Sequence, residues 1–151
     1  MPIREFQETD NLHVKELVNS ILFKEFPLSR KAYQIDDLDS ISKAYSGPRD
    51  VFYVIEEGGK IIGTVGVKED TKQIALLRRV YVHPGCRGKG HGSLLINTAI
   101  DFCKKNGYHQ IVFRSTSQMQ DAINLCSKKG FKEEERLNLG DIQIIKFALK
   151  I

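Results

Sequence analysis

One stretch, residues 80–93, constrains the fold of this chain more than any other. It reads Val-Tyr-Val-His-Pro-Gly-Cys-Arg-Gly-Lys-Gly-His-Gly-Ser and continues directly into Leu-Leu-Ile. The apolar start predicts a strand, the three glycines at alternate positions predict a loop, and the apolar pattern after them predicts a buried helix. A strand, a glycine loop and a helix start in this order can hold a pyrophosphate, because unpaired N–H groups and the helix dipole favour an anion there.

The residues of the loop distinguish between several kinds of phosphate loop. No Gly-Lys-Ser/Thr closes it, which excludes a Walker A loop, and Ser93 and Leu95 stand where the dinucleotide fingerprint requires its third glycine. The stretch fits the pattern Arg/Gln-x-x-Gly-x-Gly/Ala, filled by Arg87, Gly90 and Gly92. Arg87 and Lys89 add two positive charges, and the glycines let the backbone approach the phosphate oxygens.

Hydrophobic periodicity and turn residues predict a mixed succession of strands and helices. Strands are expected over residues 1–7, 51–55, 61–67, 73–82, 109–115, 131–138 and 142–149, and helices over residues 11–23, 35–45, 90–106 and 119–129. Gly63 and Gly66 predict a bulge or a close backbone approach in the third strand. The order β-α-α-β-β-β-α-β-α-β-β predicts an α/β protein (an α+β mixed sheet) of about seven strands with helices on both faces.

A second segment points in the same direction as the glycine loop. It reads Ala-Ile-Asn-Leu-Cys-Ser-Lys-Lys-Gly-Phe over residues 122–131. Together with the loop and its preceding Tyr-Val-His-Pro, this segment resembles the two motifs of the GNAT superfamily of acyl-CoA-dependent N-acyltransferases, the second being Ala-x-x-Leu-Tyr-x-x-x-Gly-Phe. The resemblance covers nearly the whole chain. It implies the GNAT fold and a single N-acetyltransferase domain over residues 1–151.

The resemblance implies that the fourth and fifth strands splay apart and that acetyl-CoA binds there as co-substrate. The backbones of Val80 and Val82 would pair with the pantetheine arm, and an N–H near Val80 or Tyr81 would bind the acyl carbonyl. The pyrophosphate would be held by Arg87 and by the residues after it: Gly88, Lys89, Gly90, His91, Gly92 and Ser93. The implied reaction is direct acetyl transfer in a ternary complex to a primary amine of a small molecule, amino acid or peptide.

The sequence departs from the family pattern where proton transfer is concerned. Many relatives carry a glutamate on the fourth strand, and Leu76 occupies that position here. Cys126 stands in place of the usual tyrosine acid, either as a weak general acid or as a small residue lining the pocket. Met119 replaces an asparagine that touches the cofactor in many relatives, and Tyr33, Tyr45 or Tyr81 could supply a hydroxyl instead. These departures motivate an alternative function as a non-catalytic acyl-CoA-binding sensor or regulatory domain.

Two arginines, Arg78 and Arg79, stand inside the fourth strand. Strand alternation predicts that they point to opposite faces, with Arg78 on the face of Leu76 and Val80. If Arg78 looks into the substrate cleft, it favours an acceptor with a carboxylate, such as an amino acid; a salt bridge to a helix carboxylate is the alternative. The acidic patch of Asp36, Asp37 and Asp39 reads either as a helix start or as a site for a cationic substrate.

Composition narrows the remaining classes of function. The net charge of +4 comes from interspersed charges, so no nucleic-acid-binding stripe is expected. No apolar run is long enough for a membrane span, and the first residues lack the charged-then-apolar pattern of a leader, so no membrane partner is expected. Three widely spaced cysteines and four scattered histidines predict neither disulfides nor a metal site, and favour a reducing cytoplasm. The resemblance also allows a homodimer, with the last two strands as the place of pairing.

Overall fold

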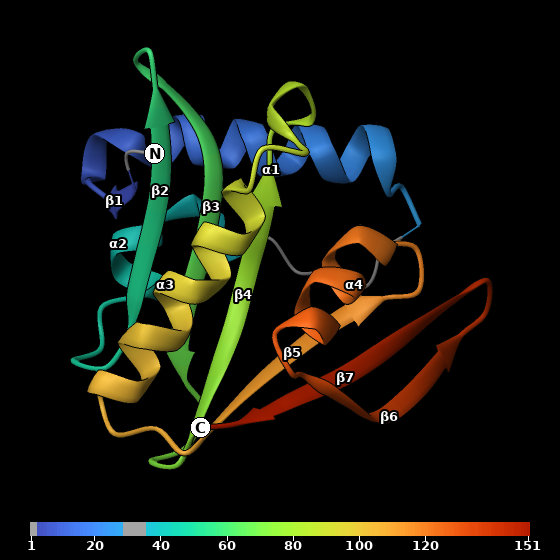
Figure 1. Cartoon of the computed structure of the whole chain (residues 1–151). Coiled ribbons are helices and arrows are strands. Elements are labelled where there is room, and N and C mark those ends of the chain that lie inside the picture. The colour runs from blue at the N-terminus through green and yellow to red at the C-terminus, as the bar shows by residue number, and fades with distance from the viewer. Residues whose placement is uncertain (1–2, 29–35) are drawn as a thin grey trace.

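The computed structural model describes residues 3–28 and 36–151, in which seven strands form one mixed sheet of order β1-β2-β3-β4-β5-β7-β6 (Figure 1). The strands are β1 (Ile3–Glu5), β2 (Val51–Glu57), β3 (Lys60–Glu69), β4 (Ile74–Val82), β5 (Gln110–Thr116), β6 (Lys132–Leu139) and β7 (Ile142–Lys150). The α-helices of the described residues are α1 (Asn11–Glu25), α2 (Ile41–Ala44), α3 (His91–Lys105) and α4 (Gln120–Lys128). The predicted mixed sheet and the predicted order of elements are confirmed.

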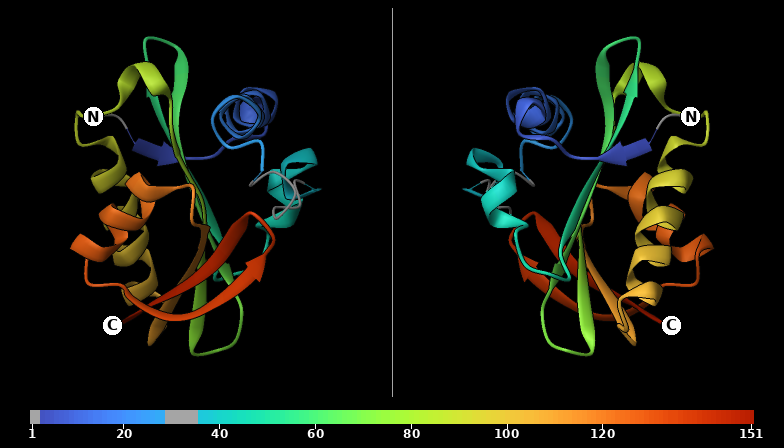
Figure 2. Two further views of the ribbon diagram at one scale, coloured as in Figure 1. Left: turned by 90° about the vertical axis from the view of Figure 1, so that its right-hand side faces the viewer. Right: turned by 90° about the vertical axis from the view of Figure 1, so that its left-hand side faces the viewer.

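Helices cover both faces of the sheet, as Figure 2 shows edge-on, with α1 and α2 on one side and α3 and α4 on the other. Each layer encloses its own apolar cluster. Leu95, Ile96, Ala99 and Cys103 are buried, at the spacing that puts them on one face of α3. The α1 layer buries Val14, Val18, Ile21 and Leu22 in the same way. No helix among the described residues is long and apolar enough to cross a membrane.

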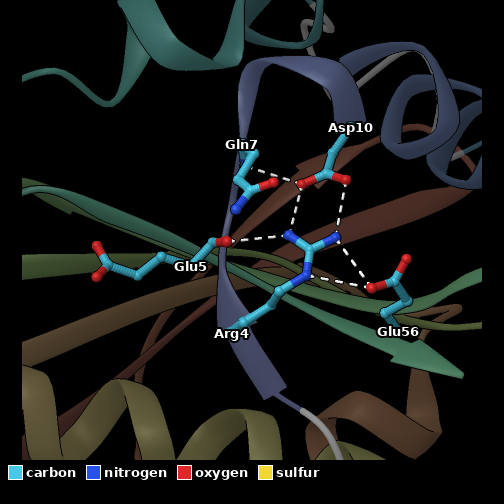
Figure 3. A network of polar contacts seen from close by, with 5 residues as sticks. All are labelled: Arg4, Glu5, Gln7, Asp10 and Glu56. Atoms are coloured by element: carbon cyan, nitrogen blue, oxygen red, sulfur yellow. Dashed lines mark hydrogen bonds and ion pairs between the residues drawn. The ribbon is translucent and has the colours of Figure 1, made fainter.

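The first two residues of the predicted N-terminal strand lie outside the described residues, and the strand ends at Glu5, two residues earlier than predicted. A network of polar contacts fixes it, seen in Figure 3. Arg4 donates to both carboxylate oxygens of Asp10, at 2.8 and 3.0 Å, and its Nε lies 3.3 Å from Glu56 Oε1. The backbone N–H of Gln7 also donates to Asp10, at 2.8 Å. Asp10 thus turns the chain directly into α1, which leaves no room for a longer strand.

The helix predicted over residues 35–45 is interrupted. Its first residue lies outside the described residues, and the remainder forms the 3-10 helix η3 (Asp36–Asp39) and the short helix α2. The Asn11 side chain explains the break, because its amide donates to the carbonyl of Leu38 while its oxygen accepts from the N–H of Ile41, both at 2.9 Å. A side chain from α1 therefore takes the backbone groups that a continuous helix would pair.

A β-bulge interrupts the pairing of β3 with β4. Gly66 pairs with Arg78 and Thr64 with Tyr81, so two residues of β4 face one residue of β3. Arg79 adopts a positive φ of 56°, and its carbonyl accepts a 2.7 Å hydrogen bond from the buried hydroxyl of Thr64. A Cβ on Gly66 would lie 2.8 Å from the Tyr45 ring. The extra residue of this bulge lies in β4, whereas β3 has an extra residue of its own at Ile62, next to Gly63, where its pairing with β2 shifts register. The expected bulge and the expected close approach are therefore both found in β3.

Candidate active site

A cavity of about 300 Å³ opens where β4 and β5 part, and Figure 1 shows the two strands diverging. Their parallel pairing ends at Leu77 and Phe113, and beyond this pair no strand of the described chain pairs with that edge of β4. Residues 76–81 and 112–114 form the walls of the cavity, which Met119, Ala122 and Ile144 complete. The cavity therefore contains a length of exposed strand edge, which is a ready partner for an extended ligand.

The direction of the backbone groups at the end of β4 supports this reading. The N–H of His83 bonds to the carbonyl of Ile62 on β3, at 2.7 Å. Neighbouring residues of a strand point their backbone N–H and carbonyl groups to opposite sides. The N–H and carbonyl of Val82 therefore point toward the free edge of β4. The carbonyl of Val82 there accepts a bond from Arg87 Nε, at 3.0 Å.

The glycine loop begins directly after this edge. His83 accepts the N–H of Gly85 on its Nδ1, at 3.0 Å, and so fixes the short 3-10 helix η4 (Pro84–Cys86). Gly88 and Gly90 have φ of 77° and 87°, a region that favours glycine. Gly90 precedes α3, and no side chain of the described residues caps this helix start. The first N–H groups of α3 therefore remain available to an anion.

Two polar side chains of the loop region, Arg87 and His91, are engaged by other parts of the protein. The Arg87 guanidinium forms a fork with Glu25, at the end of α1, with distances of 2.5 and 2.9 Å. His91 is buried, and its ring nitrogens lie 3.0 Å from the Cys86 carbonyl and 2.8 Å from Glu57 Oε2. The His91 side chain therefore braces the loop against the β2–β3 hairpin, while Lys89 is exposed.

A buried ion pair joins the bulge to the α2 layer. Arg79 Nε and Nη2 bond to the two oxygens of Asp37, at 3.0 and 2.6 Å, and the two side chains are only 3% and 9% exposed. Tyr45 also donates its hydroxyl to Asp37, at 2.9 Å. Burial by itself raises the pKa of Asp37, but the hydrogen bonds and charge of Arg79 outweigh it, and the pKa is lowered. Burial by itself lowers the pKa of Arg79, but the hydrogen bonds and charge of Asp37 outweigh it, and the pKa is raised.

The position of Arg79 corrects a prediction. Alternation places the two arginines on opposite faces, yet Arg79 bonds to Asp37 in the α1 and α2 layer, and Arg78 lies on the same side, since it pairs with Gly66, whose Cβ would meet Tyr45 of that layer. The bulge is the physical reason, because the extra residue in β4 breaks the strict alternation at that point. Asp37 lies in the first turn of η3, as the helix-start interpretation expects, but its carboxylate pairs with Arg79 and is not part of the cavity lining. Asp39 pairs with Lys15 on the surface.

The other residues singled out from the sequence have different surroundings. Cys126 is fully buried in the α3 and α4 layer, outside the cavity lining, and burial raises its pKa to about 12. Leu76 and Tyr81 do line the cavity, and burial raises the pKa of Tyr81 although Arg79 opposes this. Tyr33 lies outside the described residues. Among the described residues, no group of three or more histidine, cysteine or acidic side chains could hold a metal ion.

Comparison with known proteins decides the family. The model of the Acetyltransferase (GNAT) family matches residues 14–131, which is most of the chain. The chain belongs to the GNAT acetyltransferase family. This GNAT domain is 31% identical over 119 residues to mouse "Probable N-acetyltransferase family 8 member 5", covering 75% of the chain and 51% of that protein. It is 26% identical to "Uncharacterized N-acetyltransferase YjgM" of Escherichia coli, covering 82% of the chain and 77% of that protein.

A solved structure agrees on the fold. YncA of Salmonella typhimurium, solved with its cofactor acetyl-CoA, superposes with a TM-score of 0.80 at 22% identity, covering 99% of this chain and 93% of that one. The chain spans about half the length of the mouse relative. Sequence reasoning missed Arg114, a further arginine of the cavity in this GNAT domain. The sequence carried no signal for it, because the matching positions of Arg114 and Arg78 depend on the pairing of Phe113 with Leu77.

Proposed function

We propose that this protein transfers an acetyl group from acetyl-CoA to a primary amine by direct attack in a ternary complex. The observation that carries the proposal is one continuous surface. The free edge of β4 runs from the cavity to the glycine loop and the uncapped start of α3. An extended arm with a pyrophosphate at one end and a thioester at the other matches this surface in both shape and charge.

Each part of the surface has a role in the proposed reaction. The backbones of Val80 and Val82 hold the pantetheine arm, and the N–H groups of residues 88–93 hold the pyrophosphate. An N–H near Val80 or Tyr81 donates to the acyl carbonyl and strengthens its bond as that oxygen becomes an oxyanion. The amine nitrogen bonds to the carbonyl carbon, the C–S bond breaks, coenzyme A leaves as the thiolate, and the amine's proton passes to solvent. Holding both substrates together supplies much of the rate.

Two measurements test the proposal. Acetyl-CoA should raise the melting temperature in proportion to the logarithm of its concentration, and coenzyme A should be released when an amine acceptor is added. Gly90→Asp should abolish the melting shift, because it places an anion and a strained residue at the start of α3. Gly140→Asp is the matched control, since Gly140 also has a positive φ, 67°, in the distant β6–β7 turn. Normal binding by the Gly90 variant would refute the pyrophosphate site.

A second candidate function is an acyl-CoA-binding sensor that does not transfer the acyl group. Leu76, at the expected glutamate position, lines the cavity, and no aspartate, glutamate or histidine occurs among the described lining residues. Such a domain would show the melting shift with acetyl-CoA but release no coenzyme A with any amine. The acceptor screen therefore separates the two functions.

The cytoplasmic location and the homodimer stay predictions. The outer strand β6 is exposed along its whole length, so its free edge is the place where a second copy could pair. Sedimentation of the protein at several concentrations measures the mass directly. A monomer at all of them would exclude the dimer.

A further inference from the structure

The cavity between β4 and β5 has a cationic lining. Three arginines contribute to it, Arg78, Arg79 and Arg114, and its other described lining residues are uncharged. A cavity built only to receive an ammonium ion would place carboxylates there, because like charges repel in a partly desolvated site. The lining therefore suits an acceptor that brings a negative charge.

Arg78 and Arg114 occupy matching positions on the two diverging strands. Each is the first residue after the last β4–β5 pair, Leu77 with Phe113. Both lie on the sheet face that carries α1 and α2. The backbone position opposite Arg78 is Gly66, whose Cβ would point at Tyr45 of that layer. Arg114 shares the face of Val112, which pairs with Leu76, two residues before Arg78. The two arginines thus flank the mouth of the cavity from opposite walls.

Arg79 is neutralised by its ion pair with Asp37, whereas Arg78 has no such partner among the described residues. Asp37 bonds with both oxygens to Arg79 and accepts the Tyr45 hydroxyl as well. Arg78 lies near enough for its charge to act on Asp37. It forms no hydrogen bond or salt bridge to any residue in the described ranges 3–28 and 36–151. One carboxylate therefore faces two guanidinium groups, and one positive charge is left over at the half-buried side chain of Arg78.

The described residues around Arg114 add no carboxylate to the lining of the cavity. The partner of Arg114 across the β5–β7 pairing is Lys146, which already lies 3.4 Å from Glu134 and 3.5 Å from Glu135. These two glutamates belong to β6 and are not part of the cavity lining. Arg78 and Arg114 thus bring one guanidinium group to each wall of the cavity.

We propose that the acceptor is an α-amino acid or a similar amine with an adjacent carboxylate, and that Arg78, assisted by Arg114, binds that carboxylate. This inference rests on the proposed acetyl transfer. A guanidinium binds a carboxylate through two parallel hydrogen bonds, which would fix the neighbouring amine relative to the thioester. The same cations disfavour the ammonium form of the bound acceptor and so increase the share of neutral amine. That effect is useful where Leu76 cannot act as a base.

The test compares each amino acid with its own amide. A panel of L-amino acids, their C-terminal amides and the corresponding decarboxylated amines is assayed for coenzyme A release. The α-amine of an amino acid amide is less basic than the α-amine of the free acid. A larger share of it is therefore neutral at neutral pH, so intrinsic reactivity favours the amide. The proposal expects the acid to have the higher kcat/KM, by roughly tenfold or more, the value of one charge-assisted hydrogen bond. Equal or better transfer to the amides would overturn it.

Variants then assign the effect to the arginines. Arg78→Gln should raise KM for amino acids roughly 10- to 100-fold, leave kcat/KM for the amides nearly unchanged, and keep the melting shift with acetyl-CoA. Arg78→Lys should recover part of the loss, and Arg114→Gln should show a smaller loss. Arg136→Gln is the matched control, since that exposed arginine of β6 pairs with Glu133 away from the cavity. An equal loss for acids and amides in Arg78→Gln would overturn the assignment.

The same assays separate this inference from the proposed function. Transfer to amides or plain amines without any preference for acids would overturn the inference and leave the acetyltransferase intact. Absence of coenzyme A release with every acceptor would overturn both. A melting shift that persists without release would then favour the sensor.

Discussion

Replacing Asp37 by alanine removes the carboxylate that pairs with the buried guanidinium of Arg79. The two hydrogen bonds at 3.0 and 2.6 Å disappear, and the Tyr45 hydroxyl loses its 2.9 Å acceptor. The Arg79 side chain is 3% exposed, so water cannot replace the lost partner easily. We therefore expect a large loss of stability rather than the small one that is typical of a surface ion pair.

The geometry sets the size of the loss. A hydrogen bond to a charged group is worth about 1.5–3 kcal/mol, and removing one partner of a buried pair costs about 3–5 kcal/mol in all. For a domain of this length each kcal/mol lowers the melting temperature by roughly 2–4 °C. Asp37→Ala should therefore melt roughly 6–20 °C below the unmodified protein.

Urea unfolding monitored by circular dichroism measures the loss. Asp39→Ala is the matched control, because Asp39 belongs to the same 3-10 helix but pairs with Lys15 where the two side chains are 63% and 36% exposed. Its cost should stay below about 1 kcal/mol. If Asp37→Ala costs no more than Asp39→Ala, the buried pair is not what anchors the bulge. Combining Asp37→Ala with Arg79→Met should recover part of the loss, since no unpaired charge then stays buried.

The pair also predicts a pH dependence. The pKa of Asp37 is lowered in the folded protein. The stabilisation that its carboxylate gives the folded state is therefore fully present above the pKa of the unfolded chain, about 3.9. The contribution is lost as the pH falls below that value toward the folded pKa. The stability difference between the unmodified protein and Asp37→Asn should therefore be constant above about pH 5 and shrink below about pH 4. A difference that does not change with acidification would contradict the assignment.

Four further substitutions test other contacts of the candidate site. Gly66→Ala should lower the free energy of unfolding in urea by about 1–3 kcal/mol, because the new methyl group would lie 2.8 Å from the Tyr45 ring. An unchanged unfolding midpoint would show that β3 can move away from the ring. Cys126→Ala should lower the free energy of unfolding by about 1 kcal/mol and leave turnover unchanged, because the thiol is fully buried and its pKa is raised to about 12. A lower kcat at unchanged stability would instead support a role of Cys126 as general acid. Glu25→Gln should tighten acetyl-CoA binding measured by calorimetry, because the Glu25 carboxylate binds the Arg87 guanidinium in the unmodified protein. Arg87→Gln should weaken acetyl-CoA binding. If both variants bind acetyl-CoA as tightly as the unmodified protein, Arg87 does not reach the pyrophosphate.

The sequence alone determined the parts of this protein that depend on near neighbours. The run of β4, the glycine loop and the apolar face of α3 all lie within residues 74–105, and each is specified by residues a few positions apart. Positive φ at Gly88 and Gly90 requires glycine wherever the rest of the chain lies. The same local signals determined the order of strands and helices. The fold and the place of the candidate cofactor surface could therefore be predicted.

The tertiary structure decided which charges meet and which side chains are buried. Arg79 pairs with Asp37 across 42 positions of sequence, and Arg87 pairs with Glu25 across 62. The bulge that turns Arg79 toward Asp37 depends on the register of β3 against β4, which alternation within one strand does not contain. For the same reason the burial of Cys126 and the facing positions of Arg78 and Arg114 become visible only once the layers are packed. Local periodicity determines the elements, but only long-range packing determines their partners.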